Sequence, residues 1–224
     1  MGNDIRIAPS MLAGDFSCLG SEARRMEQAG ADWLHLDVMD GQFVPNITFG
    51  APVIKALRPH AKLVFDVHLM IDRPRRYLGD FIAAGADIIT MHVEALDDVR
   101  AAIDEIHAAG RRAALAVKPG TSIEAVYDYL DVLDMILVMT VEPGFGGRSF
   151  MADMLPKVSA LREELARRGL DVTIQVDGGI TENTITQAHA AGANCFVAGS
   201  AVFGSSNAAK KIADLRQACL LSNV

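Results

Sequence analysis

Short β-branched or apolar runs alternate along the chain with amphipathic stretches that carry charge on one face. This alternation is typical of repeated βα units over a parallel sheet. The predicted strands are 5–9, 32–38, 63–69, 87–93, 112–117, 134–141, 172–177 and 194–199, with a helix in each gap. A doubly wound open sheet shares the local pattern, but eight units without a long linker favour a TIM barrel, a single (β/α)₈ domain over residues 1–224.

Three of the expected helices end in a related tetrapeptide in which a glycine follows an alanine. The glycines are Gly30, Gly85 and Gly192. Glycine adopts the left-handed conformation that ends many helices at little cost. We interpret this repeat as helix termination with no functional content.

The composition excludes several classes of function. The 224 residues carry a formal net charge of −7. Nucleic acids and anionic lipids attract basic patches, so we expect no binding to nucleic acid or membrane. No apolar run reaches the roughly 18 residues of a membrane span. Because Cys18, Cys195 and Cys219 are far apart and the first ten residues lack a signal-peptide pattern, we expect a reduced protein in the cytoplasm.

Reactive side chains gather near the expected carboxyl ends of three strands, where a barrel of this kind carries its active site. Successive side chains of a strand alternate between its two faces. Three residues on each of two strands therefore share a face: His35, Asp37 and Met39 on the second, and Asp66, His68 and Met70 on the third. The seventh strand adds a carboxylate at its end, Asp177.

Two imidazoles and two carboxylates inside the barrel predict a metal site. A buried carboxylate is costly unless it is paired or bound to a metal. His35, Asp37, His68 and Asp177 form a mixed nitrogen and oxygen set suited to one divalent ion per subunit, whether Zn, Fe, Mn or Co. Each residue alone has an ordinary structural interpretation, but the coincidence of four favours the metal. We interpret His92, near another strand end, as structural.

Glycines that follow the last three predicted strands suggest a phosphate site. The residues are Gly144, Phe145, Gly146 and Gly147 after the sixth strand, Gly178 and Gly179 after the seventh, and Gly199 and Ser200 after the eighth. Exposed backbone N–H groups bind anions without a formal charge. Barrels frequently bind phosphate at the loops after strands seven and eight.

Several motifs together resemble one family. Residues 37–50 (DVMDGQFVPNITFG) are similar to the long signature of ribulose-phosphate 3-epimerases. The likeness extends to four shorter motifs, 8–10 (APS), 68–70 (HLM), 141–147 (VEPGFGG) and 176–180 (VDGGI). These landmarks span nearly the whole chain. The resemblance implies a metal-dependent enzyme that interconverts ribulose 5-phosphate and xylulose 5-phosphate.

The resemblance also implies roles for individual residues. The implied metal ligands are His35, Asp37, His68 and Asp177. Ser10 and His68 would contact the substrate, and the three glycine segments would line its site and hold its phosphate. Two departures bear on substrate fit: Arg148 stands where the family commonly has Gln, and residues 11–14 (MLAG) vary a segment usually closer to Ile-Leu-Ser-Ala.

The implied chemistry explains why two carboxylates are needed. Removing the C3 proton of a 2-keto sugar gives an enediolate, whose charge a divalent ion stabilises. Inversion then requires protonation from the opposite face. We therefore assign Asp37 and Asp177 as the catalytic pair, one removing a proton while the other donates. Met39, Met70 and Met139 would form an apolar collar that excludes water, with barrel packing as the alternative role.

Three other functions share some of these features. An epimerase of another ketose phosphate, such as allulose 6-phosphate, would use the same machinery. Phosphosugar decarboxylases on similar barrels use Asp-x-Lys, whereas Asp66 is followed by Val67 and His68 here. A noncatalytic phosphosugar-binding protein would not need two carboxylates on one metal. We expect a small sugar phosphate as the partner, and a homo-oligomer as the assembly.

Overall fold

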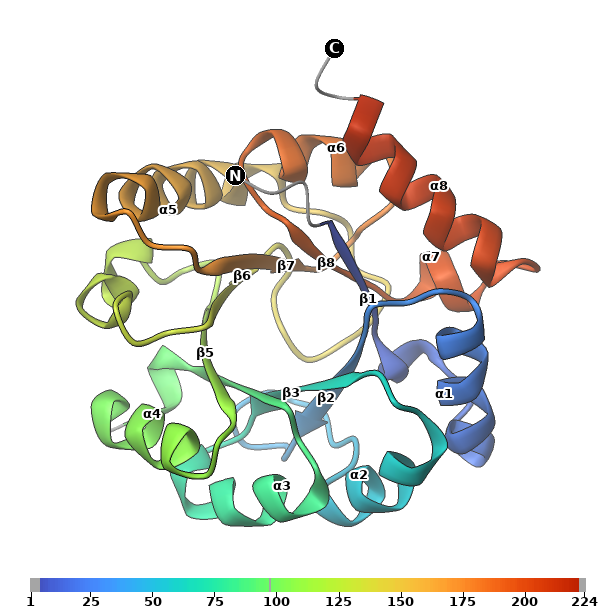
Figure 1. Cartoon of the computed structure of the whole chain (residues 1–224), viewed down its shortest axis with the longest axis horizontal. Coiled ribbons are helices and arrows are strands. Elements are labelled where there is room, and N and C mark those ends of the chain that lie inside the picture. The colour runs from blue at the N-terminus through green and yellow to red at the C-terminus, as the bar shows by residue number, and fades with distance from the viewer. Residues whose placement is uncertain (1–4, 97, 222–224) are drawn as a thin grey trace.

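Eight parallel strands form the centre of the computed structural model, which describes residues 5–96 and 98–221. The strands are β1 Arg6–Pro9, β2 Trp33–Met39, β3 Val64–Met70, β4 Ile88–His92, β5 Arg112–Val117, β6 Met135–Met139, β7 Thr173–Asp177 and β8 Cys195–Ala198. They pair in the order β1-β8-β7-β6-β5-β4-β3-β2. Figure 1 shows these strands as an inner ring surrounded by helices. The predicted (β/α)₈ barrel is confirmed, although that residues 1–224 are one domain stays a prediction.

The two end strands of this order, β1 and β2, close the ring. An isolated parallel bridge joins Ser10 to His35. At the other end of the same strands, the backbone N–H of Asp32 donates to the carbonyl of Ile7 over 3.0 Å. Closure brings Ser10, which follows β1, directly beside the reactive face of β2.

Helices connect successive strands in seven gaps and follow β8. The α-helices are α1 Leu19–Gln28, α2 Ala51–Leu57, α3 Leu78–Ala84, α4 Val99–Ala108, α5 Leu155–Arg168, α6 Glu182–Ala190, α7 Ser200–Phe203 and α8 Ala208–Leu221. The 3₁₀ helices are η1 Met11–Ala13, η2 Phe16–Cys18, η3 Arg58–His60, η4 Pro74–Tyr77, η5 Val93–Ala95, η6 Ile123–Tyr129 and η7 Ala152–Met154.

The predicted elements differ from the observed ones in two respects. Strand ends shift by one or two residues, as in β6, which spans 135–139 instead of 134–141. Between β5 and β6 only the 3₁₀ helix η6 is present, so the expectation of a regular helix there is wrong. That gap contains Pro119 and Gly120 near its start, both of low helix propensity.

The three glycines predicted to end helices do so. Gly30, Gly85 and Gly192 have φ of 83°, 97° and 114°. A Cβ on Gly192 would lie 2.7 Å from the Cβ of Arg162, so the site needs glycine for space as well as for conformation.

A side-chain hydrogen bond that recurs four times links neighbouring strands at the amino end of the barrel. Just before each even-numbered strand, an Asp or Asn side chain accepts a backbone N–H from the preceding odd-numbered strand. The four pairs are Asp32 with Ile7, Asp87 with Phe65, Asp134 with Ala113, and Asn194 with Ile174, at 2.8 to 2.9 Å. In each pair a backbone bond of 3.0 Å returns to the same odd-strand residue. The motif links neighbouring strands at the end of the barrel opposite the active site, where it stabilises the fold.

The hydrophobic core has separate parts outside and inside the strand ring. Outside, strand and helix side chains pack together, with Phe65 and Phe196 among the largest fully buried groups. Inside, the amino end is filled by Trp33, Ile88 and Met135. Apolar side chains therefore fill the barrel interior at its amino end, beneath the reactive side chains of β2 and β3.

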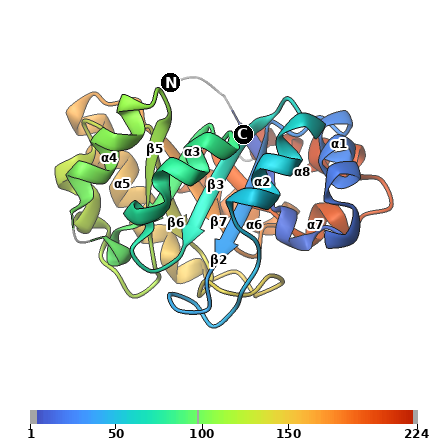
Figure 2. The same cartoon turned by 90° about the horizontal axis from the view of Figure 1, so that it is seen from below.

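The opposite, carboxyl end of the barrel is open. In Figure 2 the loops after β2 and after β6 extend beyond the ends of the strand arrows on this side. No helix in the described part of the chain is long and apolar enough to cross a membrane.

Candidate metal and active site

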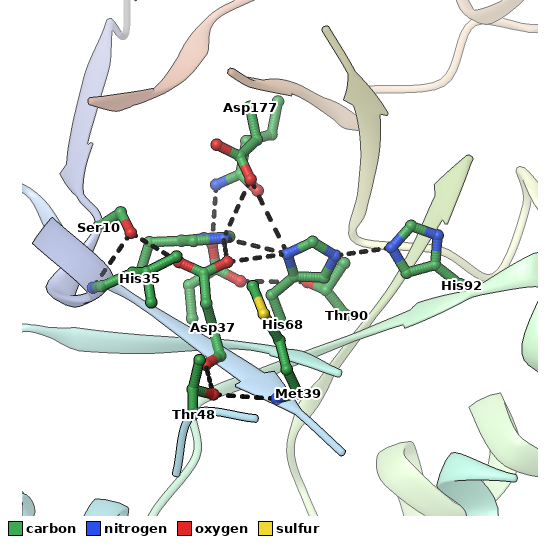
Figure 3. A network of polar contacts seen from close by, with 12 residues as sticks. Ser10, His35, Asp37, Met39, Thr48, His68, Thr90, His92 and Asp177 are labelled. Atoms are coloured by element: carbon green, nitrogen blue, oxygen red, sulfur yellow. Dashed lines mark hydrogen bonds and ion pairs between the residues drawn. The ribbon is translucent and has the colours of Figure 1, made fainter. Parts of the chain in front are cut away.

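Strand register positions the reactive side chains. In the β2–β3 ladder His35 pairs with Asp66 and Asp37 pairs with His68. All four residues are at most 3% exposed. The predicted shared face is therefore the barrel interior, where His35, Asp37 and His68 converge (Figure 3).

Four of these side chains surround a common point. One ligand atom each from His35, Asp37, His68 and Asp177 lies within 4.8 Å of the other three. Nε2 of His35 and Nδ1 of His68 are each 3.3 Å from Oδ1 of Asp37, and they lie 3.8 and 3.9 Å from Oδ2 of Asp177. A tetrahedral ion with ligands at about 2.0–2.1 Å needs ligand atoms roughly 3.3 Å apart. The predicted ligand set fits a divalent ion in both chemistry and spacing.

The second ring nitrogen of His35 is bonded to a buried carboxylate. Its Nδ1 lies 2.7 Å from Oδ2 of Asp66. Asp66 also accepts from Nε2 of Gln175 at 2.7 Å and from Oγ1 of Thr90 at 3.1 Å. Burial raises the pKa of Asp66, but His35, Gln175 and His68 outweigh it and hold the pKa below its usual range. Asp66 therefore orients His35 with Nε2 toward the ion site.

The second ring nitrogen of His68 meets another imidazole. Its Nε2 lies 2.9 Å from Nε2 of His92, and the Nδ1 of His92 lies 3.2 Å from Oε2 of Glu94. Burial lowers the pKa of His92 to about 4, so this ring is neutral at neutral pH. The prediction that His92 is structural stays open, because it touches a proposed ligand.

Asp37 presents its two oxygens to different partners. Oδ1 faces the two histidines, while Oδ2 accepts the hydroxyl of Ser10 over 2.6 Å. The backbone at Asp37 is fixed as well, because Oγ1 of Thr48 donates to its carbonyl at 2.6 Å. One carboxylate oxygen is thus available to an ion and the other to a proton donor.

The two aspartates have opposite electrostatic environments. Burial would raise the pKa of Asp37, but His35 and His68 hold it well below its usual range. Burial and then the charge of Asp37 raise the pKa of Asp177 to about 6. Burial lowers the pKa of His35, yet Asp37 and Asp66 more than reverse this and raise it. Without a metal, Asp37 therefore stays ionised over the pH range near 6 in which Asp177 gains or loses its proton.

The two aspartates of the ligand set lie at the floor of a cavity of about 1080 Å³. The predicted residues that line it are Ser10, Asp37, Met39, Met70, Met139, Gly144, Phe145, Gly146, Gly147, Asp177, Gly178, Gly179, Gly199 and Ser200. The cavity does not contact His35 or His68, which are fully buried beneath it. Arg148 also lines the cavity and is exposed.

Two glycines after β7 are required by the way the loops pack. A Cβ on Gly178 (φ 125°) would lie 2.5 Å from Cγ1 of Val141, and a Cβ on Gly179 (φ 67°) would lie 2.5 Å from the backbone N of Phe150. Thr140 bridges the same loops, because its Oγ1 donates to the carbonyl of Gly178 at 2.8 Å. The loops after β6 and β7 form one packed wall.

The loop after β2 contacts the glycine loop after β6. Oδ1 of Asp40 accepts the backbone N–H groups of Gln42 and Phe43 at 2.8 and 2.9 Å, which shapes the turn. Nδ2 of Asn46 donates to the carbonyl of Gly144 at 2.8 Å. The 37–50 signature thus connects a proposed ligand to the glycine loop after β6.

Sequence reasoning missed the supporting roles of Asp66, Gln175, His92 and Glu94. A signal existed for Asp66, which shares strand parity with His68, and for Gln175, which shares parity with Asp177. The link from His92 to Glu94 runs across the end of β4 and has no such periodic signal.

The chain is similar to known proteins over nearly its full length. A model of the ribulose-phosphate 3 epimerase family matches residues 6–203. A ribulose-phosphate 3-epimerase of Synechocystis sp. is 49% identical over 96% of this chain and 95% of its own. One from Bacillus subtilis is 44% identical over 95% of this chain and 98% of its own.

Solved structures of other barrels share the fold at low identity. A 3-hexulose-6-phosphate synthase from Salmonella typhimurium has a TM-score of 0.67 at 20% identity, covering 97% of this chain and 100% of its own. Orotidine 5'-phosphate decarboxylase from Pyrococcus horikoshii has a TM-score of 0.68 at 15% identity, covering 96% of this chain and 99% of its own. These likenesses support the barrel alone. The matched family model and the identities to curated relatives show that the chain belongs to the ribulose-phosphate 3-epimerase family, whose members are isomerases.

Proposed function

We propose that this protein is a metal-dependent ribulose-phosphate 3-epimerase that interconverts D-ribulose 5-phosphate and D-xylulose 5-phosphate. The observation that carries the proposal is the pair of aspartates at the cavity floor, where burial and the charge of Asp37 raise the pKa of Asp177 while the pKa of Asp37 is lowered. Two carboxyl groups whose pKa values are pushed apart are suited to acid and base roles.

The chain's own residues perform the proton transfers. One of Asp37 and Asp177 removes the C3 proton, and the other delivers a proton to the opposite face, with the roles exchanged in the reverse direction. Ser10 positions Oδ2 of Asp37 through its 2.6 Å hydrogen bond. His35 and His68 would hold the ion together with the two carboxylates. When bound, a divalent ion supplies positive charge that stabilises the enediolate.

The remaining cavity residues would bind and enclose the sugar phosphate. The glycine loops after β6, β7 and β8 line the cavity. Their backbone N–H groups can donate hydrogen bonds to a phosphate, so no buried cationic side chain is needed to bind it. The three methionines of the collar are at most 4% exposed and also line the cavity. There they would exclude water and competing proton donors from the intermediate.

Exchange in deuterated water tests this function. Metal-loaded protein mixed with ribulose 5-phosphate in D₂O should form xylulose 5-phosphate that carries deuterium at C3. Chelation of the metal should stop both processes, and Zn, Fe, Mn or Co should restore them to different extents. Absence of both product and C3 deuterium in the metal-loaded protein would contradict the proposal.

Separate replacement of the two aspartates tests their assignment. Asp37→Asn and Asp177→Asn should each abolish epimerisation while the fold is kept, because each removes the base for one face. Full activity in either variant would contradict the two-carboxylate assignment.

A related reaction remains the second candidate. Because the same machinery would act on another ketose phosphate, kcat/KM for ribulose 5-phosphate should be compared with that for allulose 6-phosphate. A higher value for allulose 6-phosphate would reassign the substrate. A cytoplasmic location and a homo-oligomeric state stay predictions, to be checked by cell fractionation and by light scattering.

A further inference from the structure

Each proposed histidine ligand has a carboxylate on the side of its ring that faces away from the ion site, but the two carboxylates lie at different distances. Asp66 contacts the remote nitrogen of His35 directly at 2.7 Å. For His68 the carboxylate is Glu94, and the ring of His92 lies between them, with contacts of 2.9 and 3.2 Å. Neither His92 nor Glu94 lines the cavity. The proton-transfer scheme does not use them.

Hydrogen-bond directions along this chain determine which nitrogens carry protons. The Glu94 carboxylate can only accept, and its other oxygen already accepts the backbone N–H of Lys118 at 2.8 Å. Nδ1 of His92 must therefore carry a hydrogen that it donates to Glu94. With Nδ1 as the donor to Glu94, Nε2 of His92 is the nitrogen left to accept, and it lies 2.9 Å from Nε2 of His68, which donates to it.

This direction leaves Nδ1 of His68 without a hydrogen, facing the proposed ion site. The alternative tautomer has a competing attraction, because Oδ1 of Asp37 lies 3.3 Å from the same Nδ1 and would accept a hydrogen from it. A hydrogen on Nδ1 would leave that nitrogen without a lone pair for the ion. It would also form a hydrogen bond to Oδ1 of Asp37, which is itself a proposed ligand. Glu94 and Asp37, the carboxylates at the two ends of this series of hydrogen bonds, thus favour opposite tautomers of His68.

We propose that His92 and Glu94 are positioning residues that fix His68 as a bare Nδ1 ligand before the metal arrives. The proposal rests on the metal site of the proposed function. Ring packing supports it, because Phe43 lies against His92 with centroids 4.8 Å apart, and Nζ of Lys118 lies 3.6 Å from the centre of the Phe43 ring. The orientation of His92 is thereby held from its face as well as from its edges.

Nitrogen-15 NMR of the histidine rings in chelated, metal-free protein tests the tautomers directly. The wild type should carry hydrogen on Nε2 of His68 and on Nδ1 of His92. In Glu94→Leu, His92 should no longer be held as the Nδ1–H tautomer alone, and the tautomer population of His68 should shift toward Nδ1–H. Glu94→Gln keeps an acceptor oxygen and should retain the wild-type pattern. Nδ1–H on His68 in the wild type would overturn the proposal.

Metal affinity gives a second readout that does not depend on turnover. Titration with Zn or Co against a competing chelator should show about 10- to 100-fold weaker binding in His92→Phe and in Glu94→Leu. Binding in Glu94→Gln should stay within a few-fold of the wild type. Glu164→Leu, which removes a carboxylate that pairs with Arg167 and Arg168 on α5, is the matched control and should bind as the wild type does.

The outcomes separate this proposal from the function on which it rests. Wild-type affinity in a folded His92→Phe or Glu94→Leu protein, checked by circular dichroism, would overturn the positioning role. Failure of the wild type itself to bind any divalent ion would overturn the metal site, while the NMR pattern would still decide the tautomers. If a leucine or phenylalanine variant does not fold, the wild-type NMR pattern remains decisive.

Discussion

The hydroxyl of Ser10 donates to Oδ2 of Asp37 over 2.6 Å, across the seam where β1 meets β2. This bond keeps Oδ2 away from the two histidines and leaves Oδ1 as the oxygen that faces them. Asp37 can therefore contribute to metal binding and to proton transfer with different atoms.

Ser10→Ala should lower kcat/KM for ribulose 5-phosphate about 10- to 100-fold, in the range seen when a group that orients a metal ligand is removed. The reason is that Oδ2 of Asp37 loses its fixed partner and can turn toward the histidines. Steady-state kinetics at saturating metal measures the effect. Ser17→Ala, which removes an exposed hydroxyl that donates to Asp15, is the control and should leave kcat/KM unchanged. Equal kinetics in both variants would exclude this role for Ser10.

Gly178→Ala should destabilise the protein by about 1–3 kcal/mol, because φ is in the left-handed region and the new Cβ would lie 2.5 Å from Val141. Urea unfolding measures the free energy. Gly79→Ala is the matched control on α3, where a Cβ meets nothing within 4 Å, and it should be neutral or stabilising by about 0.5–1 kcal/mol. The same stability in both alanine variants would refute the packed wall between the loops after β6 and β7.

Glu94 should make the free energy of unfolding depend on pH. Burial raises its pKa, but hydrogen bonds from His92, Thr121 and the Lys118 backbone outweigh it and lower the pKa to about 2 from 4.5. A depressed pKa stabilises the fold above the unfolded value, and this stabilisation is lost as pH falls from 4.5 toward 2. Glu94→Gln should therefore be less stable than the wild type at pH 7, by about 1–2 kcal/mol. The difference in unfolding free energy between the wild type and Glu94→Gln should become smaller below pH 4.5.

Urea unfolding of wild type and Glu94→Gln at pH 7, 5, 4 and 3 checks this trend. Glu164 offers a contrast, because its pKa is also lowered to about 2, by hydrogen bonds from Arg167 and Arg168 on an exposed helix surface. Added salt should remove the effect of Glu164→Gln but leave most of that of Glu94→Gln. A pH-independent difference for Glu94→Gln would show that its carboxylate charge does not contribute.

Arg148→Gln should raise KM about three- to tenfold with little change in kcat, because the cavity mouth loses a positive charge that attracts the phosphate. Arg148 is exposed, lines the cavity and lies with its guanidinium 5.5 Å from the centre of the Phe145 ring. The KM difference should narrow as salt is added. Arg100→Gln, which removes an exposed charge on α4, is the control. An unchanged KM in Arg148→Gln would place this arginine outside substrate recognition.

Periodicity was sufficient to predict the barrel and the inward orientation of three of the four proposed ligands. Alternation along β2 placed His35 and Asp37 on the inner face, and the same rule for β3 placed His68 there. These predictions hold because a side chain's face depends only on its position in the strand. Asp177 was located by its place at the end of β7.

Contacts between strands could not be predicted in the same way. The bonds from Ser10 to Asp37 and from His92 to His68 depend on barrel closure and on rotamers, neither of which a single strand specifies. The segment after β5 failed for a different reason. Its apolar residues Ile123, Val126 and Leu130 have the spacing of an α-helix, but the backbone of 123–129 forms a 3₁₀ helix.

The Asp and Asn side chains at the amino end always link an odd-numbered strand to the next even-numbered one. No such bond crosses from an even strand to the following odd strand among these four pairs. The barrel is in this respect a ring of four two-stranded units. New chain termini placed before β3, β5 or β7 would leave all four links inside intact units, whereas a cut before an even strand would place one link across the break.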